Sequence, residues 1–313
     1  MEQIFCRLSK ICGMKQWGAN MDNLKIDRVG ERSLTAADDC AISCIPPGQL
    51  EDQGAVVTPT SAAGVHGIPT KDDAESDIDA MVASLGLQSI RRYMDQYHWH
   101  EESQLARAAD EAEPGLKLEN VAAHSWHVAD AIMLLAPNFP EVDLRRALEL
   151  AILHDKLELF TGDFDPVGPA GDGSNAHVFD PRAGAAKMAL ELAALDHYVS
   201  RLRPPIRTQH RNLLLETIHG QSAEARLVKA VDKLQALAFV LEKKAGAMTD
   251  EHLVFSLRYS AKAVEYFPKL IMHHRALVRR LIRMIADYRN VATGAVIAAL
   301  PEPVRPMATA AEV

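Results

Sequence analysis

The stretch VDLRRALELAILHDKLELFTGD, residues 142–163, decides the fold. Its apolar residues leave almost no polar side, which predicts a helix that is buried nearly all round. The helix leads into His154 and Asp155, and Glu158 follows four residues after His154, so both side chains lie on one face. The glycine near the end of the stretch suits a helix C-cap, which places Asp163 at the start of the following loop.

The same helical character continues along most of the chain. Apolar residues recur at helical spacing, proline and glycine separate the segments, and the period-two alternation of strands is almost absent. We predict an all-α fold with helices near residues 78–96, 101–112, 120–136, 142–160, 182–202, 206–219, 222–245, 249–264, 267–289 and 290–299. The connection Thr161–Pro181 is the longest break. Its glycines and aspartates favour a mobile connector over a lid in which His177 touches a substrate.

The N-terminal quarter of the chain has a different composition. Gly, Pro, Ser, Thr and Asp are frequent over residues 1–77, and the acidic run Lys71–Asp79 marks the boundary. We therefore predict a flexible, poorly structured N-terminal extension (1–77), a helical domain (78–300) and a C-terminal tail (301–313). All four cysteines lie in the extension, and their spacing favours free thiols over a structural zinc site. They are Cys6, Cys12, Cys40 and Cys44.

Composition and charge restrict the classes of function. Hydrophobic residues make up 48% of the chain, enough for a sizeable core, and the formal net charge is −8. This charge argues against a protein that binds nucleic acid electrostatically. No stretch reaches the roughly 18 apolar residues of a membrane span, and the N-terminus lacks the apolar region of a signal peptide. We expect a cytoplasmic protein that binds neither nucleic acid nor membrane.

Two further helices carry an ionisable side chain where apolar residues are expected. His124 falls on an apolar stripe, and Asp232 lies in line with Val228 and Phe239. A single core histidine is more often hydrogen-bonded than metal-bound, and Asp232 could pair with Arg226 or Lys229 of its own helix or with Arg207. The joint pattern of His, then His-Asp, then Asp on separate buried helices favours a metal site, because a cation neutralises the buried carboxylates.

The donor set suits one divalent metal ion. Two imidazoles and two carboxylates fit Mn, Co, Fe, Ni or Zn, with Mg also open, and leave positions for water and substrate. A bound ion lowers the pKa of its water and polarises a phosphoryl oxygen. The candidate ligands are His124, His154, Asp155 and Asp232.

The residues around these ligands resemble those of the HD superfamily of metal-dependent phosphohydrolases, whose ligands follow the order His, His-Asp, Asp. The matching fragments are ENVAAHSWHVA (119–129), LAILHDKLELFTGD (150–163) and EARLVKAVDKLQAL (224–237). The phrases TGD and LVKxxDKLxA are more specific than the His-Asp pair. They are similar to the bacterial 5′-deoxynucleotidase group and its eukaryotic HD-domain relatives.

This resemblance implies an HD-domain helical bundle with a single divalent metal ion at the two histidines and two aspartates. It implies hydrolysis of the phosphate ester of (deoxy)nucleoside 5′-monophosphates to nucleoside and phosphate by a metal-activated water. Glu158 matches the glutamate that orients or deprotonates that water, and Asp163 matches the aspartate that protonates the leaving 5′-oxygen. The presence of both favours catalysis over a non-catalytic, metal-stapled nucleotide-binding module.

The chain also departs from the family pattern before the first ligand. Ala123 stands where the family usually has glutamate. The bacterial enzymes carry, shortly before the first ligand, an arginine and a tryptophan that hold the phosphate and the sugar. Neither has a clear counterpart here: Arg107 is the nearest arginine, Lys117 is a closer cation, and Trp126 is expected to be a packing residue.

Other activities stay open. Removal of tripolyphosphate or pyrophosphate from dNTPs, or cleavage of a signalling nucleotide, would need further cations near the metal. The candidates are Lys156, Lys187, Arg207 and His210. The part His252–Leu300 is predicted as an amphipathic helix with a solvated basic face, where a homodimer interface is an additional option.

Overall fold

The structure is a computed structural model that describes residues 71–93, 96, 98–99, 118–167, 172–174 and 176–304. Every described residue belongs to one compact unit, residues 69–313. The predicted extension lies outside the described residues except for its last part, and so do the four cysteines, the helix expected near 101–112, Arg107 and Lys117. Within the described ranges the chain forms helices, turns and one isolated bridge between Arg91 and Asn120, which confirms the predicted all-α fold.

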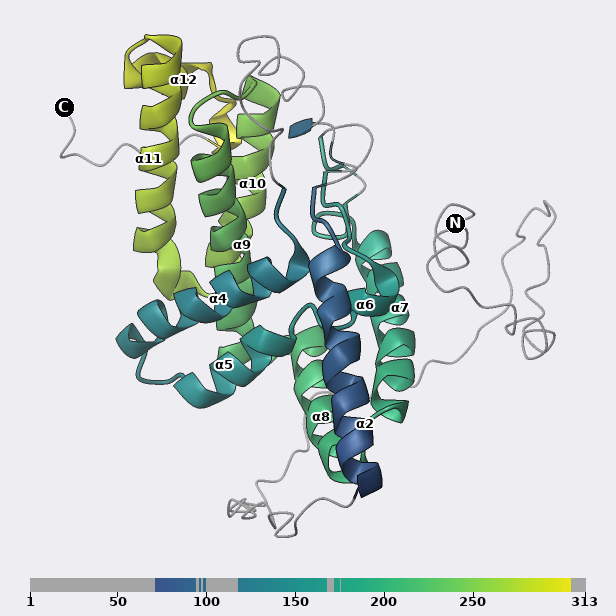
Figure 1. Ribbon diagram of the computed structural model, residues 1–313. Helices are drawn as coiled ribbons and strands as arrows, with labels where there is room; N and C mark the ends of the chain where they lie inside the picture. The colour runs from purple at the N-terminus through teal and green to yellow at the C-terminus, as the bar shows by residue number, and fades with distance from the viewer. Residues whose placement is uncertain are drawn as a thin grey trace, which may run out of the picture. The chain divides into compact units, whose positions relative to one another are not determined.

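Figure 1 shows the order of the helices along the chain. They are α2 (Lys71–Ser84), η2 (Leu85–Ser89), α4 (Val121–Leu135), η3 (Ala136–Asn138), α5 (Leu144–Leu153), α6 (Glu158–Thr161), α7 (Pro181–Ser200), α8 (Pro204–His219), α9 (Ala223–Lys244), α10 (Asp250–Tyr266), η4 (Pro268–Leu270), α11 (Ile271–Arg289), α12 (Thr293–Ala299) and η5 (Glu302–Val304). None of these helices is long and apolar enough to cross a membrane.

Local capping residues explain where several of these helices start and end. Asn120 accepts a hydrogen bond from Ala123 N at the start of α4, and Ser222 and Thr249 do the same for α9 and α10. Gly220 adopts the left-handed conformation (φ 64°) that ends α8. These short-range signals are visible in the sequence, which is why the predicted bounds agree with the structure within a few residues here.

The first predicted helix is wrong in its bounds. It begins at Lys71 and its helical part ends at Ser89, instead of running from 78 to 96. The acidic run expected to mark a domain boundary forms the first turns of α2, where carboxylates favour a helix N-terminus. Arg203 at the start of α8 fixes this helix by donating to both Asp77 carboxylate oxygens, at 2.8 and 2.7 Å.

The helix predicted over 142–160 is interrupted. Helix α5 ends at Leu153, a turn follows, and α6 begins at Glu158. In the turn, Lys156 N donates to Leu153 O (2.9 Å) and Glu158 N donates to Asp155 O (3.1 Å), which are i to i+3 bonds tighter than those of an α-helix. The His-Asp pair therefore lies in a turn between two helices and not inside one helix.

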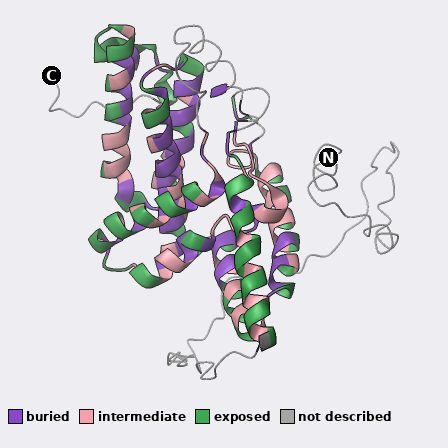
Figure 2. Cartoon of the chain, viewed as in Figure 1, coloured by how far each residue is buried: buried purple, intermediate pink, exposed green. Residues whose placement is uncertain are grey.

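Helix α9 lies at the centre of the core. Residues along most of its length are buried, as Figure 2 shows. One cluster packs α9 against α4 and α5 through fully buried residues such as Ile132, Leu150 and Leu227. A second cluster packs it against α10 and α11 through Leu253 and Leu281. With α4, α5 and α10 all against α9, side chains from separate parts of the chain meet beside it.

The C-terminal part contains three separate helices, α10, α11 and α12, which correspond to the helices predicted near 249–264, 267–289 and 290–299. The predicted solvated basic face is found on α11, where Arg279, Arg280 and Arg283 are exposed. His252 and Tyr259 of α10 instead point into the protein and are buried.

Candidate metal centre

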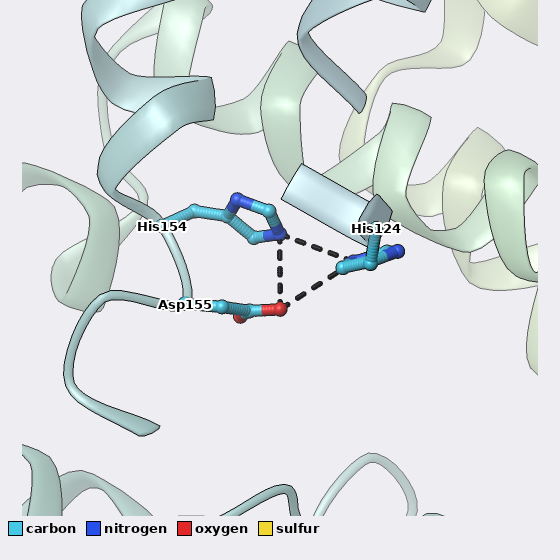
Figure 3. Close-up of side chains that lie close together, drawn as sticks. All are labelled: His124, His154 and Asp155. Carbon is cyan, nitrogen blue, oxygen red and sulfur yellow. Dashed lines mark hydrogen bonds and ion pairs between the residues drawn. The ribbon is translucent and has the colours of Figure 1, made fainter. Parts of the chain in front are cut away.

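Three of the predicted ligands meet between α4 and the turn after α5. His124 of α4, His154 and Asp155 point toward one another in Figure 3. His124 Nε2 lies 3.3 Å from His154 Nε2 and 3.4 Å from Asp155 Oδ2, and His154 Nε2 lies 3.2 Å from the same oxygen. One ligand atom from each residue falls within 4.8 Å of the others. The tight turn after Leu153 lets two consecutive side chains reach one point.

The fourth predicted ligand reaches the same point from α9. Asp232 Oδ1 lies 3.1 Å from His124 Nε2. The structure gives Asp232 a partner other than the Arg226, Lys229 or Arg207 considered from the sequence, since Lys229 donates to Ile218 O and Arg207 to Leu202 O. Asp232 instead accepts a hydrogen bond from its neighbour Lys233, whose Nζ lies 2.7 Å from Oδ2. The structure thus brings all four predicted side chains together.

The charges at this point favour a bound cation. Burial and the Arg92 guanidinium oppose protonation of His124, yet the carboxylates of Asp232, Glu119 and Asp155 outweigh them and raise its pKa to about 9. Burial likewise acts to raise the pKa of Asp155, but the neighbouring histidines lower it well below its usual range. The site therefore stabilises positive charge and keeps its carboxylates ionised, so the residues present fit a divalent metal ion.

The histidine rings are held in the orientation that metal binding needs. His124 Nδ1 lies 2.8 Å from Gln235 Oε1, and His154 Nδ1 lies 2.7 Å from Ala151 O. These acceptors assign the proton of each ring to Nδ1. Each Nε2 atom faces the carboxylates, which is the position from which it would bind a metal ion in place of a proton.

Asp232 is oriented by a buried lysine and a buried tyrosine. Lys233 Nζ donates to Asp232 Oδ2 and to Tyr259 OH, at 2.7 and 2.8 Å. Lys233 and Tyr259 are both buried. The ammonium therefore holds one carboxylate oxygen and leaves Oδ1 directed at His124.

Replacing Lys233 by methionine is expected to destabilise the metal-free protein by about 2 to 4 kcal/mol, because it leaves the buried Asp232 carboxylate without its fixed cation. A divalent ion restores a positive partner, so added metal should stabilise the variant more than the wild type. Chemical denaturation with and without chelator measures both effects. Lys262→Met is the control, and an unchanged metal-free stability of the Lys233 variant would contradict the pairing.

The two predicted catalytic carboxyl groups lie in the pocket beside these residues. Glu158 starts α6 and is buried, and its Oε2 has no hydrogen-bond partner in the described part of the chain. Gly162, at φ 71°, ends α6 and turns the chain so that Asp163 also lines the pocket. Burial first, and then the charge of Asp155, raises the pKa of both carboxyl groups. Each is therefore inclined to hold a proton.

The structure adds an arginine that the sequence analysis missed. Arg92 is buried, donates to Glu119 Oε2 at 2.9 Å, and places Nη1 2.5 Å from His124 Nδ1 and Nε 3.6 Å from Asp163 Oδ1. It precedes His124 by 32 residues. The search close to the first ligand therefore found only Arg107 and Lys117.

Backbone pairing brings Arg92 to the site. Arg92 N donates to Glu119 O at 3.0 Å, and Val121 N donates to Ile90 O at 3.0 Å, so this segment lies beside the start of α4. The next residue, Tyr93, has a φ of 66°, a strained conformation for a bulky side chain. The signal available in the sequence was a basic residue followed by an aromatic one, in the order expected for the family's arginine and tryptophan.

Of the four cations considered for extra phosphates, one lies at the site. Lys187 of α7 lines the pocket. Arg207 instead donates to Leu202 O, and His210 Nδ1 pairs with Tyr198 OH at 2.8 Å. Lys156 follows Asp155 directly but does not line the pocket.

Two other expectations are wrong. The connection after Thr161 is not simply a mobile connector, because Val167 is buried in a cluster with α10 residues and His177 lines the pocket beside the metal site. Burial and the nearby lysines lower the pKa of His177 to about 3, so it is neutral at physiological pH. Trp126 is not a packing residue either, since 64% of it is exposed on α4.

Fold and site together define the class, an all-α protein with a buried His and Asp centre suited to a divalent metal ion. A sequence profile described as "HD domain" matches residues 104–270, which is more than half of the chain. The chain therefore belongs to the HD-domain family, as its motifs predicted, and its His-His-Asp cluster is a group that could hold a metal ion.

The chain is also similar to several individual proteins. The chain is 30% identical over 139 residues to 5′-deoxynucleotidase HDDC2 from Xenopus laevis, which covers 43% of this chain and 62% of that relative. A predicted metal-dependent phosphohydrolase from Magnetospirillum magnetotacticum is 21% identical, with a TM-score of 0.48 over 69% of this chain and 97% of the other. A conserved hypothetical protein from Pyrococcus furiosus is 22% identical, with a TM-score of 0.41 over 64% and 99%.

Proposed function

We propose that this protein hydrolyses (deoxy)nucleoside 5′-monophosphates to nucleoside and orthophosphate, with a divalent metal ion held by His124, His154, Asp155 and Asp232. The observation that carries the proposal is the pocket itself, which is lined by the proposed ligands Asp155 and Asp232 together with two carboxyl groups of raised pKa. The similarity to a 5′-deoxynucleotidase supports a nucleoside monophosphate as the substrate.

The charge of the pocket suits a phosphate monoester. Three cations and four carboxyl groups line it. With all groups ionised this set has a net charge of −1, and a divalent ion would change it to about +1. One proton on Glu158 or Asp163 would raise the net charge to about +2, which balances the dianion of a monoester. A triphosphate carries roughly twice that charge and would find no further cation among the described lining residues. The cations are Arg92, Lys187 and Lys233, and the carboxyl groups are Asp155, Glu158, Asp163 and Asp232.

Each residue would contribute a separate part of the reaction. A bound divalent ion supplies a polarised phosphoryl oxygen and a water of lowered pKa. Glu158 orients the attacking water and, in its ionised form, takes up the proton of that water; burial and the charge of Asp155 raise its pKa, which makes it a stronger base. Asp163 donates its proton to the leaving 5′-oxygen, and the Arg92 guanidinium near its Oδ1 orients this carboxyl group.

Product analysis across dNMPs, NMPs and dNTPs with Mn, Co, Mg, Ni or Zn tests this function. Orthophosphate and nucleoside from the monophosphates are expected. Tripolyphosphate or pyrophosphate from dNTPs, with the monophosphates left intact, would reject the proposal in favour of a triphosphohydrolase or pyrophosphohydrolase.

A further inference from the structure

Lys187 stands on the wall of the metal pocket, on a different helix from every proposed ligand. Helix α7 packs against α6, the short helix that begins at Glu158 (Figure 1). Lys187 lines the same pocket as Asp155 and Glu158 and interacts electrostatically with both. Its Nζ also lies 5.2 Å from the centre of the Phe164 ring. Phe164 is the residue that follows the proposed acid Asp163 in the sequence. An anion bound at the metal site would therefore meet this ammonium.

The hydrogen bonds of the three pocket cations differ. Arg92 donates a hydrogen bond to Glu119 and forms an ion pair with Asp163, and Lys233 donates hydrogen bonds to Asp232 and Tyr259. Lys187 has, within the described ranges, a single acceptor, the Glu191 carboxylate one turn along its own helix. An ammonium carries three N–H donors.

Lys187 thus keeps donors for a ligand although its side chain is only 22% exposed. The Glu191 carboxylate raises its pKa against the effect of burial, so the group is charged at neutral pH. A charged, largely buried ammonium with unused donors in a pocket is arranged to accept an oxyanion from outside the protein.

We propose that Lys187 binds a non-bridging phosphoryl oxygen of the substrate, while Lys233 acts as a positioning residue for Asp232. This deepens the proposed function and rests on it for the identity of the substrate. Lys187 has fewer hydrogen-bond acceptors in the described part of the chain than Lys233, which leaves its ammonium donors for the phosphoryl group. A lysine is a point charge with rotatable donors, so it can follow the oxygen as the phosphorus changes geometry.

The test compares Lys187→Met with Lys187→Arg and with a matched control, Lys262→Met. Lys262 is also on a helix, is 24% exposed, pairs with Glu265 and lies 5.8 Å from the Phe179 ring, but it does not line the pocket. Binding of inorganic phosphate to the metal-loaded protein is measured by calorimetry, together with metal affinity and kcat/KM for nucleoside monophosphates. Loss of one charged hydrogen bond predicts about 10- to 100-fold weaker phosphate binding in Lys187→Met.

The expected pattern is weak phosphate binding in Lys187→Met with unchanged metal affinity, partial recovery in Lys187→Arg, and wild-type behaviour of Lys262→Met. If the wild type binds phosphate through Lys187 but hydrolyses no nucleoside monophosphate, the inference stands and the proposed substrate fails. If it hydrolyses monophosphates and Lys187→Met binds phosphate as tightly as the wild type, the inference is overturned and the proposed function stands. Absence of phosphate binding in the metal-loaded wild type overturns the inference as well.

Discussion

Replacing Asp155 by alanine is expected to abolish metal binding and hydrolysis together. Asp155 Oδ2 lies within 3.4 Å of the Nε2 atoms of both His124 and His154, so its loss removes the carboxylate nearest to both imidazoles. Mutating a residue that only hydrogen-bonds to a metal ligand lowers metal affinity or activity by about 10- to 100-fold. Loss of a ligand itself should lower them by about a thousandfold or more. Metal content by mass spectrometry and the rate of phosphate release measure the two effects.

A matched control separates this effect from general damage. Asp130→Ala changes an exposed aspartate on α4 and should retain metal and activity. Full metal occupancy in Asp155→Ala would show that Asp155 is not a ligand. A variant that retains the fold, judged by circular dichroism, makes either result interpretable.

Replacing Glu158 by glutamine is expected to leave metal binding intact and to lower the turnover by about 10²- to 10⁴-fold, the usual range for a general acid or base. The glutamine keeps the shape of the side chain but cannot accept a proton from water. Because burial and the charges of Asp155 and Asp163 raise the pKa of Glu158, the anion is disfavoured in the folded protein. The metal-free variant should therefore unfold at the same or a higher temperature.

The corresponding control is Glu149→Gln in α5, where the glutamate pairs with Arg145 at 3.2 Å on the protein surface. Its turnover should equal that of the wild type. An unimpaired rate in Glu158→Gln would remove the role assigned to Glu158, and loss of metal in that variant would make it a ligand instead.

The ligand candidates could be found from the sequence because each one breaks a local pattern. His124 and Asp232 are ionisable residues on otherwise apolar helical faces, and His154 with Asp155 follows directly after the apolar residues at the end of α5. A burial pattern that repeats with each helical turn involves only residues three or four positions apart, so it can be found in the sequence alone. For the same reason the predicted bounds of α4, α7, α9 and α10 differ from those in the structure by only a few residues.

The partners of these ligands could not be found in that way. Arg92 lies 32 residues before His124, and a pairing of backbone segments brings it to the site. Nothing in the spacing distinguishes Lys187 from Lys156 or Arg207, because position in the pocket depends on how α7 packs against α6. The break in the 142–160 helix was also missed, since the tight turn after Leu153 has no proline or glycine to mark it.

Helical periodicity, capping and burial of charge are local properties, so they are enough to predict an all-α HD-domain protein and the residue types that a divalent metal ion needs. Which cations face the site depends on tertiary packing. A salt bridge or hydrogen bond between distant segments depends on distances of a few ångströms, and those distances exist only after α4, α7 and α9 have packed.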